Sequence, residues 1–284
     1  MPQGGPDLPR FKHRTSHTTI FRTRPPSERP LLQIKGSQAY NQTMPTYQTT
    51  GIVIGRTNFG EADRIVRFLT PEHGKLSAVA KGVRKIKSRL AGHLELFAES
   101  GLSLATGRNL HVVTSARLAW YPHQLTGDFD RLQLAYLFAR LIDRTAGEGQ
   151  PQPGLYKHLQ DTLHALDAGA TGPLPELWFR LRLLALTGLR PELGHCVVCG
   201  QTGAATQFAF SNTHGGIVCD RDATPGDPTM SQASIKLWRL LSDYPYATIA
   251  KIADAQSLAA ASLPICLGFY THHLGSANLD YTKP

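Results

Sequence analysis

Four residues in one short segment have the types and spacing of a metal site. Cys196 and Cys199 form a C-x2-C pair, whose two thiolates suit one tetrahedral zinc ion. The same spacing, counted from Cys219, predicts a further ligand at position 222, where the sequence has Asp222. A carboxylate oxygen is a harder donor than a thiolate and makes such a site weaker and more labile. We therefore predict a structural Zn²⁺ ion held by Cys196, Cys199, Cys219 and Asp222.

The fourth ligand has alternatives in the same segment, namely His195, His214 and Asp220. A ribbon without metal, held by packing alone, would also fit the sequence, and we favour bound zinc over it. The remaining cysteine, Cys266, lies in an apolar segment, where we expect a core residue. Because the other three of the four cysteines are clustered, a secreted disulfide scaffold is disfavoured and a reducing cytoplasm is favoured.

An enzymatic use of these residues finds no support. Zinc deaminases pair an H-x-E motif with a later P-C-x-x-C motif. His93 and Glu95 match the first half, but His195 stands where the second half needs a proline. The Gly-Lys-Ser/Thr of a phosphate-binding loop is absent, so nucleotide hydrolysis finds no support either. We predict that the chain is not an enzyme.

A second group with chemical potential is the run of cations from Lys81 to Arg89. This stretch, which we call the basic loop, holds five positive charges in nine residues and no carboxylate. Such charges repel one another unless an anion lies against them, and a phosphate backbone is the usual one. An isolated run of charges is more often a solvated surface loop, so the place of this run in the fold decides between that interpretation and phosphate binding. Its cations are Lys81, Arg84, Lys85, Lys87 and Arg89.

The overall charge strengthens this argument only slightly. The formal net charge of the 284 residues is +9, and seven basic against two acidic residues put +5 of it in residues 1–43. That segment is rich in Pro, Arg, Ser and Thr and poor in apolar residues, so it cannot bury enough surface to fold. We expect it to be a disordered basic arm or an extraneous upstream extension. A transit peptide would also fit its composition, but an amphipathic helix is missing.

Between residues 47 and 118 the pattern predicts five short strands. They cover 49–54, 64–69, 75–80, 94–104 and 110–114, separated by turn residues. Five short strands favour a small closed barrel, most often an OB fold. Such barrels bind single strands through a basic groove with exposed aromatic rings. The basic loop falls between the third and fourth strands, and this position favours DNA binding over a merely solvated loop.

Further residues of this segment are candidates for the same surface. The additional cations are Arg56, Arg64, Arg67, Lys75 and Arg108. Phe59 and Phe97 are candidates for stacking on bases, although an aromatic ring in a small barrel is more often part of the core.

The second half of the chain has helical periodicity. Apolar stripes predict helices at 132–141, 155–166, 173–186, 231–241 and 255–274. Asp128 or Thr126 would cap the first helix, and Pro264 should kink or split the last one. No apolar run approaches the roughly 18 residues needed to span a bilayer, so we expect no membrane partner.

Several motifs in the first half resemble a known family. They are Tyr47-Gln48-Thr49-Thr50-Gly51-Ile52-Val53-Ile54, Gly60-Glu61-Ala62-Asp63-Arg64-Ile65-Val66, Thr70-Pro71-Glu72-His73-Gly74-Lys75 and Ala80-Lys81-Gly82-Val83-Arg84. Together they are similar to the amino-terminal domain of the bacterial DNA repair family RecO, and the resemblance extends from residue 44 to about residue 275. It implies an α+β chain with an OB-fold barrel, followed by a helical domain that carries a zinc-ribbon-like insertion. The family often has four cysteines in that insertion, and this chain departs from the pattern at Asp222.

From the pattern and the resemblance together we expect five parts. They are an extraneous or disordered segment (1–43), an OB-fold nucleic-acid-binding domain (44–122), a helical domain (123–275) with a zinc-ribbon-like insertion (195–224), and a C-terminal tail (276–284).

The resemblance also implies a function in recombination and DNA repair. Proteins of this family bind single- and double-stranded DNA and anneal complementary strands. With the partner RecR they help to load the RecA recombinase onto DNA coated by single-strand-binding protein, at the cytoplasmic nucleoid. The alternative function is a zinc-ribbon scaffold for protein–protein contacts that does not anneal DNA.

Overall fold

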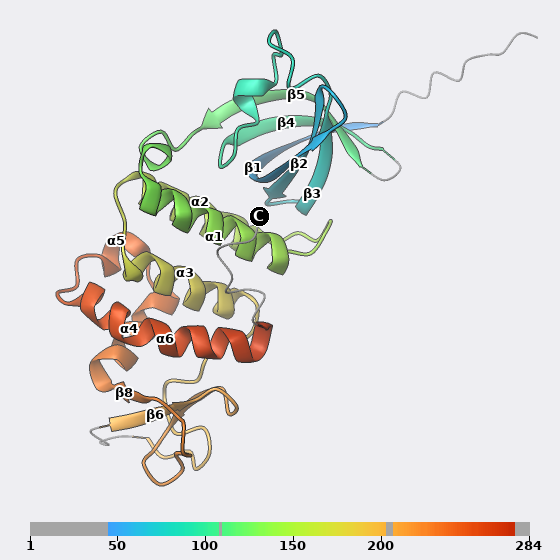
Figure 1. Cartoon of the computed structure of the whole chain (residues 1–284). Coiled ribbons are helices and arrows are strands. Elements are labelled where there is room, and N and C mark those ends of the chain that lie inside the picture. The colour runs from blue at the N-terminus through green and yellow to red at the C-terminus, as the bar shows by residue number, and fades with distance from the viewer. Residues whose placement is uncertain (1–44, 108–109, 203–206, 276–284) are drawn as a thin grey trace, which may run out of the picture. The chain divides into compact units, whose positions relative to one another are not determined.

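Five strands close into a barrel at the start of the described chain, with one parallel pair of neighbours and otherwise antiparallel pairs. The computed structural model describes residues 45–107, 110–202 and 207–275 (Figure 1). The barrel strands are β1 (Thr46–Phe59), β2 (Asp63–Thr70), β3 (Gly74–Ala80), β4 (Glu99–Ala105) and β5 (His111–Trp120), in the order β1-β2-β3-β5-β4. In β3 the alternation expected of a half-buried strand is present, because Leu76, Ala78 and Ala80 are buried and their neighbours are less so. The predicted OB-like barrel is confirmed.

Three strands differ from their predicted bounds, and the first of them, β1, extends well beyond 49–54 at both ends. The segment before β4 is not extended, because a short 3₁₀ helix, η1 (Ala91–His93), and a residue with positive φ, Phe97 (φ 66°), precede the strand. Backbone hydrogen bonds from Phe97 N to Val53 O and from Val53 N to Ala98 O fix this bend against β1. The strand pattern of Leu94–Ala98 therefore reflects burial in a turn, whereas β5 continues beyond 114 to Trp120.

Helices make up most of the rest of the described chain. They are α1 (Phe129–Thr145), α2 (Pro153–Asp167), α3 (Pro173–Leu186), α4 (Gln232–Asp243), α5 (Tyr246–Ile249) and α6 (Ala255–Leu274), with a short 3₁₀ turn, η2 (Leu125–Gly127), before α1. Asp128 caps α1, since its side chain accepts a hydrogen bond from Arg131 N at 3.0 Å. Pro264 does not split α6, which runs through it as one helix, and the four-residue α5 was not predicted.

The hydrophobic core continues from the barrel into the helices. Ile52, Ile54 and Leu69 of the barrel belong to the same buried cluster as the helical residues. The linker between α1 and α2 pairs with the start of β3, which β5 does not reach, and there Lys75 N donates to Gly147 O and Gly149 N donates to Lys75 O. Polar contacts add to this packing, because Tyr156 Oη of α2 donates to the carboxylate of Glu99 on β4 at 2.8 Å.

A small sheet lies between α3 and α4 in the sequence. Its strands are β6 (Gln207–Ser211), β7 (Gly216–Val218) and β8 (Thr229–Ser231), in the order β7-β6-β8. This sheet carries the cysteine segment that was predicted to be a zinc-ribbon-like insertion. Nowhere in the described ranges is there a helix with the length and apolar character that crossing a membrane requires.

Candidate metal centre and nucleic-acid interface

The structure brings the four predicted metal ligands together. One ligand atom from each of Cys196, Cys199, Cys219 and Asp222 can be chosen so that all four lie within 4.8 Å of one another. The Sγ atoms of Cys199 and Cys219 are 3.8 Å apart, and Asp222 Oδ2 is 3.1 Å from the Sγ atoms of both Cys196 and Cys219. Ligands at about 2.3 Å around a tetrahedral ion stand about 3.8 Å apart. The cluster therefore has the size that holds a single metal ion.

Two turns of backbone position these side chains. In the first, Cys196 and Cys199 face each other because Gly200 N donates to Cys196 O at 2.9 Å and Gly200 takes a positive φ of 73°. In the second, Asp222 N donates to Cys219 O at 3.0 Å, directly after β7 ends. Val197 N donates to Ile217 O at 3.0 Å and joins the two turns. Each pair is thus preformed by its own turn.

The alternative fourth ligands lie outside this group. His195 Nδ1 lies 3.4 Å from the Glu192 carboxylate, and His214 Nδ1 lies 3.0 Å from Ser211 Oγ. Asp220 is exposed and is not a member of the group of four. Among the described residues, Asp222 is therefore the residue that completes the set.

Hydrogen bonds link the thiols of the cluster to the carboxylate of Asp222 and change their pKa values. Hydrogen bonds from the thiols of Cys199, Cys219 and Cys196 lower the pKa of Asp222 to about 2. The same carboxylate raises the pKa of the Cys199 thiol to about 11. Burial would raise the pKa of Cys196, but backbone N–H groups directed at its sulfur bring it below its ordinary value. A bound cation would stabilise all four charged forms at once, so the donor set fits zinc.

The basic loop leaves the barrel as an anchored surface loop. Lys81, Arg84, Lys85, Lys87 and Arg89 are all exposed. In the described ranges, none of these five cations forms an ion pair with a carboxylate. Val83, 3% exposed, and the partly buried Leu90 pack into the barrel core on either side of the charged tip. The loop thus presents its charge from two hydrophobic anchors.

The turn between β1 and β2 supports the base of this loop. Asp63 Oδ1 accepts a hydrogen bond from Gly82 N at 2.7 Å, and Arg84 N donates to Ala62 O at 2.9 Å. The Arg84 side chain also donates to Gly60 O at 3.2 Å. Phe59, at the end of β1 and paired in register with Asp63, is 52% exposed. An exposed aromatic ring therefore stands in the β1–β2 hairpin, whose turn contacts the base of the basic loop.

Two family models match the chain. "Recombination protein O N terminal" matches residues 44–121, and "Recombination protein O C terminal" matches residues 126–280. The chain belongs to the RecO family. Among curated relatives, "DNA repair protein RecO" of Roseiflexus sp. (strain RS-1) is 38% identical over 80% of this chain and 81% of its own length. The protein of the same name from Bifidobacterium adolescentis is 39% identical over 68% of this chain and 80% of its own length.

The remaining predicted contacts of this RecO-family chain divide into paired and accessible side chains. Arg56 is bound to the Glu95 carboxylate at 2.5 Å, and Lys75 is 16% exposed and lies 3.6 Å from the Asp143 carboxylate. Arg64 is partly exposed and donates to Asn58 Oδ1 at 3.1 Å. It pairs in register with Ala80, next to the start of the basic loop. Arg108 lies outside the described residues.

The two phenylalanines proposed for stacking differ in their exposure to solvent. Phe97 is 1% exposed and packs edge-on against Tyr136, with ring centroids 5.3 Å apart. It belongs to the core, whereas Phe59 remains accessible. Cys266 is fully buried, as predicted. Sequence reasoning missed Asp143 because its partners Arg67 and Lys75 are far from it in sequence, and no local pattern reports such a contact.

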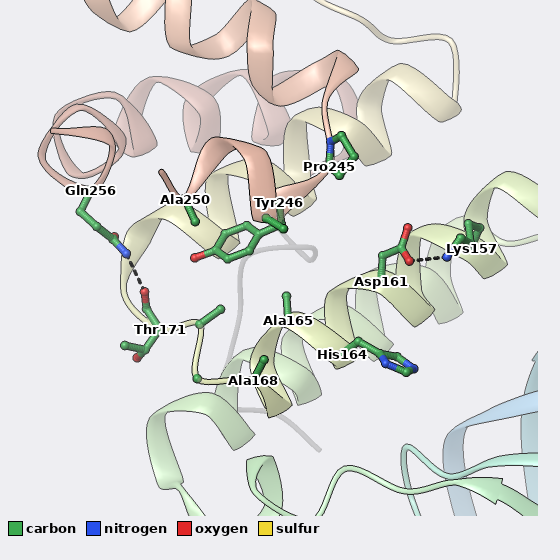
Figure 2. A pocket seen from close by; sticks show the side chains of 13 residues that line it. Lys157, Asp161, His164, Ala165, Ala168, Thr171, Pro245, Tyr246, Ala250 and Gln256 are labelled. Atoms are coloured by element: carbon green, nitrogen blue, oxygen red, sulfur yellow. Dashed lines mark hydrogen bonds and ion pairs between the residues drawn. The ribbon is translucent and has the colours of Figure 1, made fainter. Parts of the chain in front are cut away.

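An apolar cavity of about 850 Å³ lies between the C-terminal half of α2 and α5 (Figure 2). Ala165, Ala168 and Tyr246 form part of its wall. Its charged lining residues Lys157 and Asp161 are paired with each other at 2.5 Å. These two charges offset each other, and the lining imidazole of His164 stacks on Trp120 with ring centroids 4.0 Å apart.

Proposed function

We propose that the chain is a DNA-binding recombination mediator that acts in DNA repair. On this proposal it binds single- and double-stranded DNA and anneals complementary strands. Membership of the RecO family supports it, together with relatives named as DNA repair proteins. By the same resemblance it works with RecR to load the RecA recombinase onto single strands coated by single-strand-binding protein, at the cytoplasmic nucleoid.

The observation that carries the proposal is the basic loop on the barrel. Its five cations are exposed and have no carboxylate partner in the described ranges. Phosphates would supply the missing negative charge and release their counterions on binding. Neutralising two backbones at one loop lowers their mutual repulsion, so complementary strands can approach and pair. Annealing by this route needs no nucleotide hydrolysis.

We assign the direct phosphate contacts within residues 44–122 to the five loop cations and to Arg64. Arg56 and Lys75 are also candidates for this surface, but their ion pairs with Glu95 and Asp143 reduce the charge that they offer to DNA. The exposed ring of Phe59 is the stacking partner for a base of a single strand.

We further propose that the cluster of Cys196, Cys199, Cys219 and Asp222 holds a structural Zn²⁺ ion. The ion would supply the attraction that fixes the two turns of the ribbon, whose own buried cluster counts four members among the described residues. In this role zinc stabilises residues 195–224 and takes no part in a reaction.

The test is the salt dependence of binding to a fluorescent oligothymidine. The variant Lys85→Gln/Lys87→Gln removes two loop cations, and the control Lys236→Gln/Lys251→Gln removes two exposed lysines of the helical half. Each lost phosphate contact should reduce the slope of log K against log salt by about 0.7, so the loop variant should lose about 1.4. The control should keep the wild-type slope. A flat wild-type slope, or equal slopes for the two variants, would refute DNA binding by the loop.

A second function is favoured by one exposed side chain. Val198 stands between the two cysteines of the first turn and is 50% exposed, so the tip of the ribbon offers an apolar side chain to a protein partner. A zinc-ribbon scaffold would then act without annealing DNA. Strand annealing measured with two complementary oligonucleotides separates the two functions, because the scaffold leaves the spontaneous rate unchanged.

A further inference from the structure

The three thiols of the metal cluster differ in their access to solvent. Cys199 is exposed at the end of the first turn, whereas Cys196 and Cys219 are buried. The exposed sulfur has a neighbour within reach, because Cys219 Sγ lies 3.8 Å away. A disulfide bond is about 2.05 Å long, so these sulfurs would have to approach by roughly 1.8 Å. Cys199 precedes Gly200, and rotation of an exposed side chain at the end of a turn can supply that movement.

The third thiol of the cluster, that of Cys196, is held inside the ribbon. Cys196 Sγ accepts a hydrogen bond from Cys219 N at 3.4 Å and also contacts the Asp222 carboxylate. These contacts and its complete burial hold the Cys196 sulfur inside the ribbon, within 4.8 Å of Cys199. A soluble oxidant would therefore meet Cys199 first, and Cys219 Sγ, 3.8 Å away, is a sulfur within its reach.

We propose that the metal centre is also a site of reversible oxidation, in which hydrogen peroxide joins Cys199 and Cys219 as a disulfide and releases the metal. This rests on the zinc site of the proposed function. Peroxide oxidises the Cys199 thiolate to a sulfenic acid and leaves as water once a proton is supplied. The Cys219 thiolate then attacks that sulfur and displaces hydroxide, which a second proton converts to water. Two thiolates, one peroxide and two protons thus give one disulfide and two waters.

Loss of these two ligands leaves only Cys196 and Asp222. One thiolate and one carboxylate cannot hold zinc as the complete set does, and the carboxylate is the weaker donor. The new disulfide would still join the two turns of the ribbon, so the fold can survive while the ion leaves. A thiol reductant would then restore the site.

The experiment treats the zinc-loaded, full-length chain with a graded excess of hydrogen peroxide under anaerobic conditions. Zinc release is followed with a chromophoric chelator, free thiols are counted, and the disulfide is located by mass spectrometry after alkylation and digestion. We expect the four thiols of the chain to fall to two as the zinc is lost, with one ion released per disulfide. Reduction followed by addition of zinc should restore both counts.

Two variants sharpen the assignment. Cys266→Ala removes a buried thiol that is absent from the cluster and should leave release unchanged. Cys199→Ser should abolish the disulfide to Cys219. A disulfide that involves Cys196, or full oxidation with zinc retained, would overturn the proposal. A chain isolated without zinc would overturn the zinc assignment and the release step together, whereas a Cys199–Cys219 disulfide in that chain would still support the pairing.

Discussion

The side-chain nitrogen of Lys75 on β3 lies 3.6 Å from the carboxylate of Asp143 on α1 and 2.5 Å from its backbone carbonyl oxygen. Arg67 of the neighbouring strand lies 3.3 Å from the same carboxylate. One acidic residue of the first helix therefore binds two strands of the barrel. Lys75, which sequence reasoning assigned to DNA, has its charge directed at this contact.

We predict that Lys75→Gln lowers stability more than DNA affinity. The amide would leave the partly buried Asp143 carboxylate with one cation fewer, at a cost of about 1–2 kcal/mol in the free energy of unfolding. Urea unfolding measures this loss. Lys85→Gln is the matched control and should show the reverse, with weaker binding to single strands and unchanged stability. Equal losses of DNA affinity in Lys75→Gln and Lys85→Gln would show that Lys75 also contacts DNA.

Phe59 and Phe97 should respond oppositely to truncation. Phe59→Ala removes an exposed ring and should weaken binding to single strands by about 1–3 kcal/mol, roughly 5- to 150-fold, with little effect on unfolding. Phe97→Ala removes a buried ring and should cost about 3–5 kcal/mol of stability. Fluorescence anisotropy and urea unfolding on both variants make the comparison. Undiminished binding by Phe59→Ala would exclude the stacking role.

Local patterns were sufficient for most elements and for the metal cluster. Cys196 and Cys199 are three positions apart, and a single turn brings such neighbours together whatever the rest of the fold does. Asp222 could be named for the same reason, from its spacing to Cys219. The exposed basic loop also follows from local composition, because no carboxylate lies within it to neutralise its charge.

Several failures of prediction concern contacts between distant residues. Lys75 and Asp143 are 68 positions apart, so no periodicity reports that they meet. The apolar residues Leu94, Phe97 and Ala98 resemble a strand because they are buried, but the positive φ of Phe97 and its hydrogen bond to Val53 turn the backbone instead. Burial and strand geometry leave similar sequence patterns, and only the tertiary structure separates them.

Acid should destabilise the chain through His158. This side chain is fully buried in α2, and its Nε2–H donates to Phe179 O at 3.0 Å. Burial lowers its pKa from 6.5 to about 3. Between these values the unfolded chain binds a proton that the folded chain excludes. The contribution of His158 to stability is therefore full above pH 6.5 and falls by about 1.4 kcal/mol per pH unit as the medium is acidified towards pH 3.

Urea unfolding at pH 7 and pH 5 tests this linkage. The variant His158→Leu should show a smaller loss of stability between the two pH values than the wild type, by roughly 2 kcal/mol. His123→Gln changes an exposed imidazole and serves as the control, with a wild-type pH dependence. If His158→Leu loses as much stability between pH 7 and pH 5 as the wild type, the acid sensitivity comes from other groups.

Substitutions at Asp222 should change the rate at which the chain exchanges zinc. Asp222→Cys supplies a fourth thiolate and should exchange zinc with a chelator more slowly than the wild type, because thiolate is the softer and stronger donor. Asp222→Ala leaves the three thiolates of Cys196, Cys199 and Cys219 and should exchange it faster. Zinc content by mass spectrometry and the exchange rate measure this order. Binding to single strands should stay within about twofold in both variants, because the basic loop and the ribbon belong to different elements. Equal zinc retention by wild type and Asp222→Ala would show that Asp222 is not a ligand.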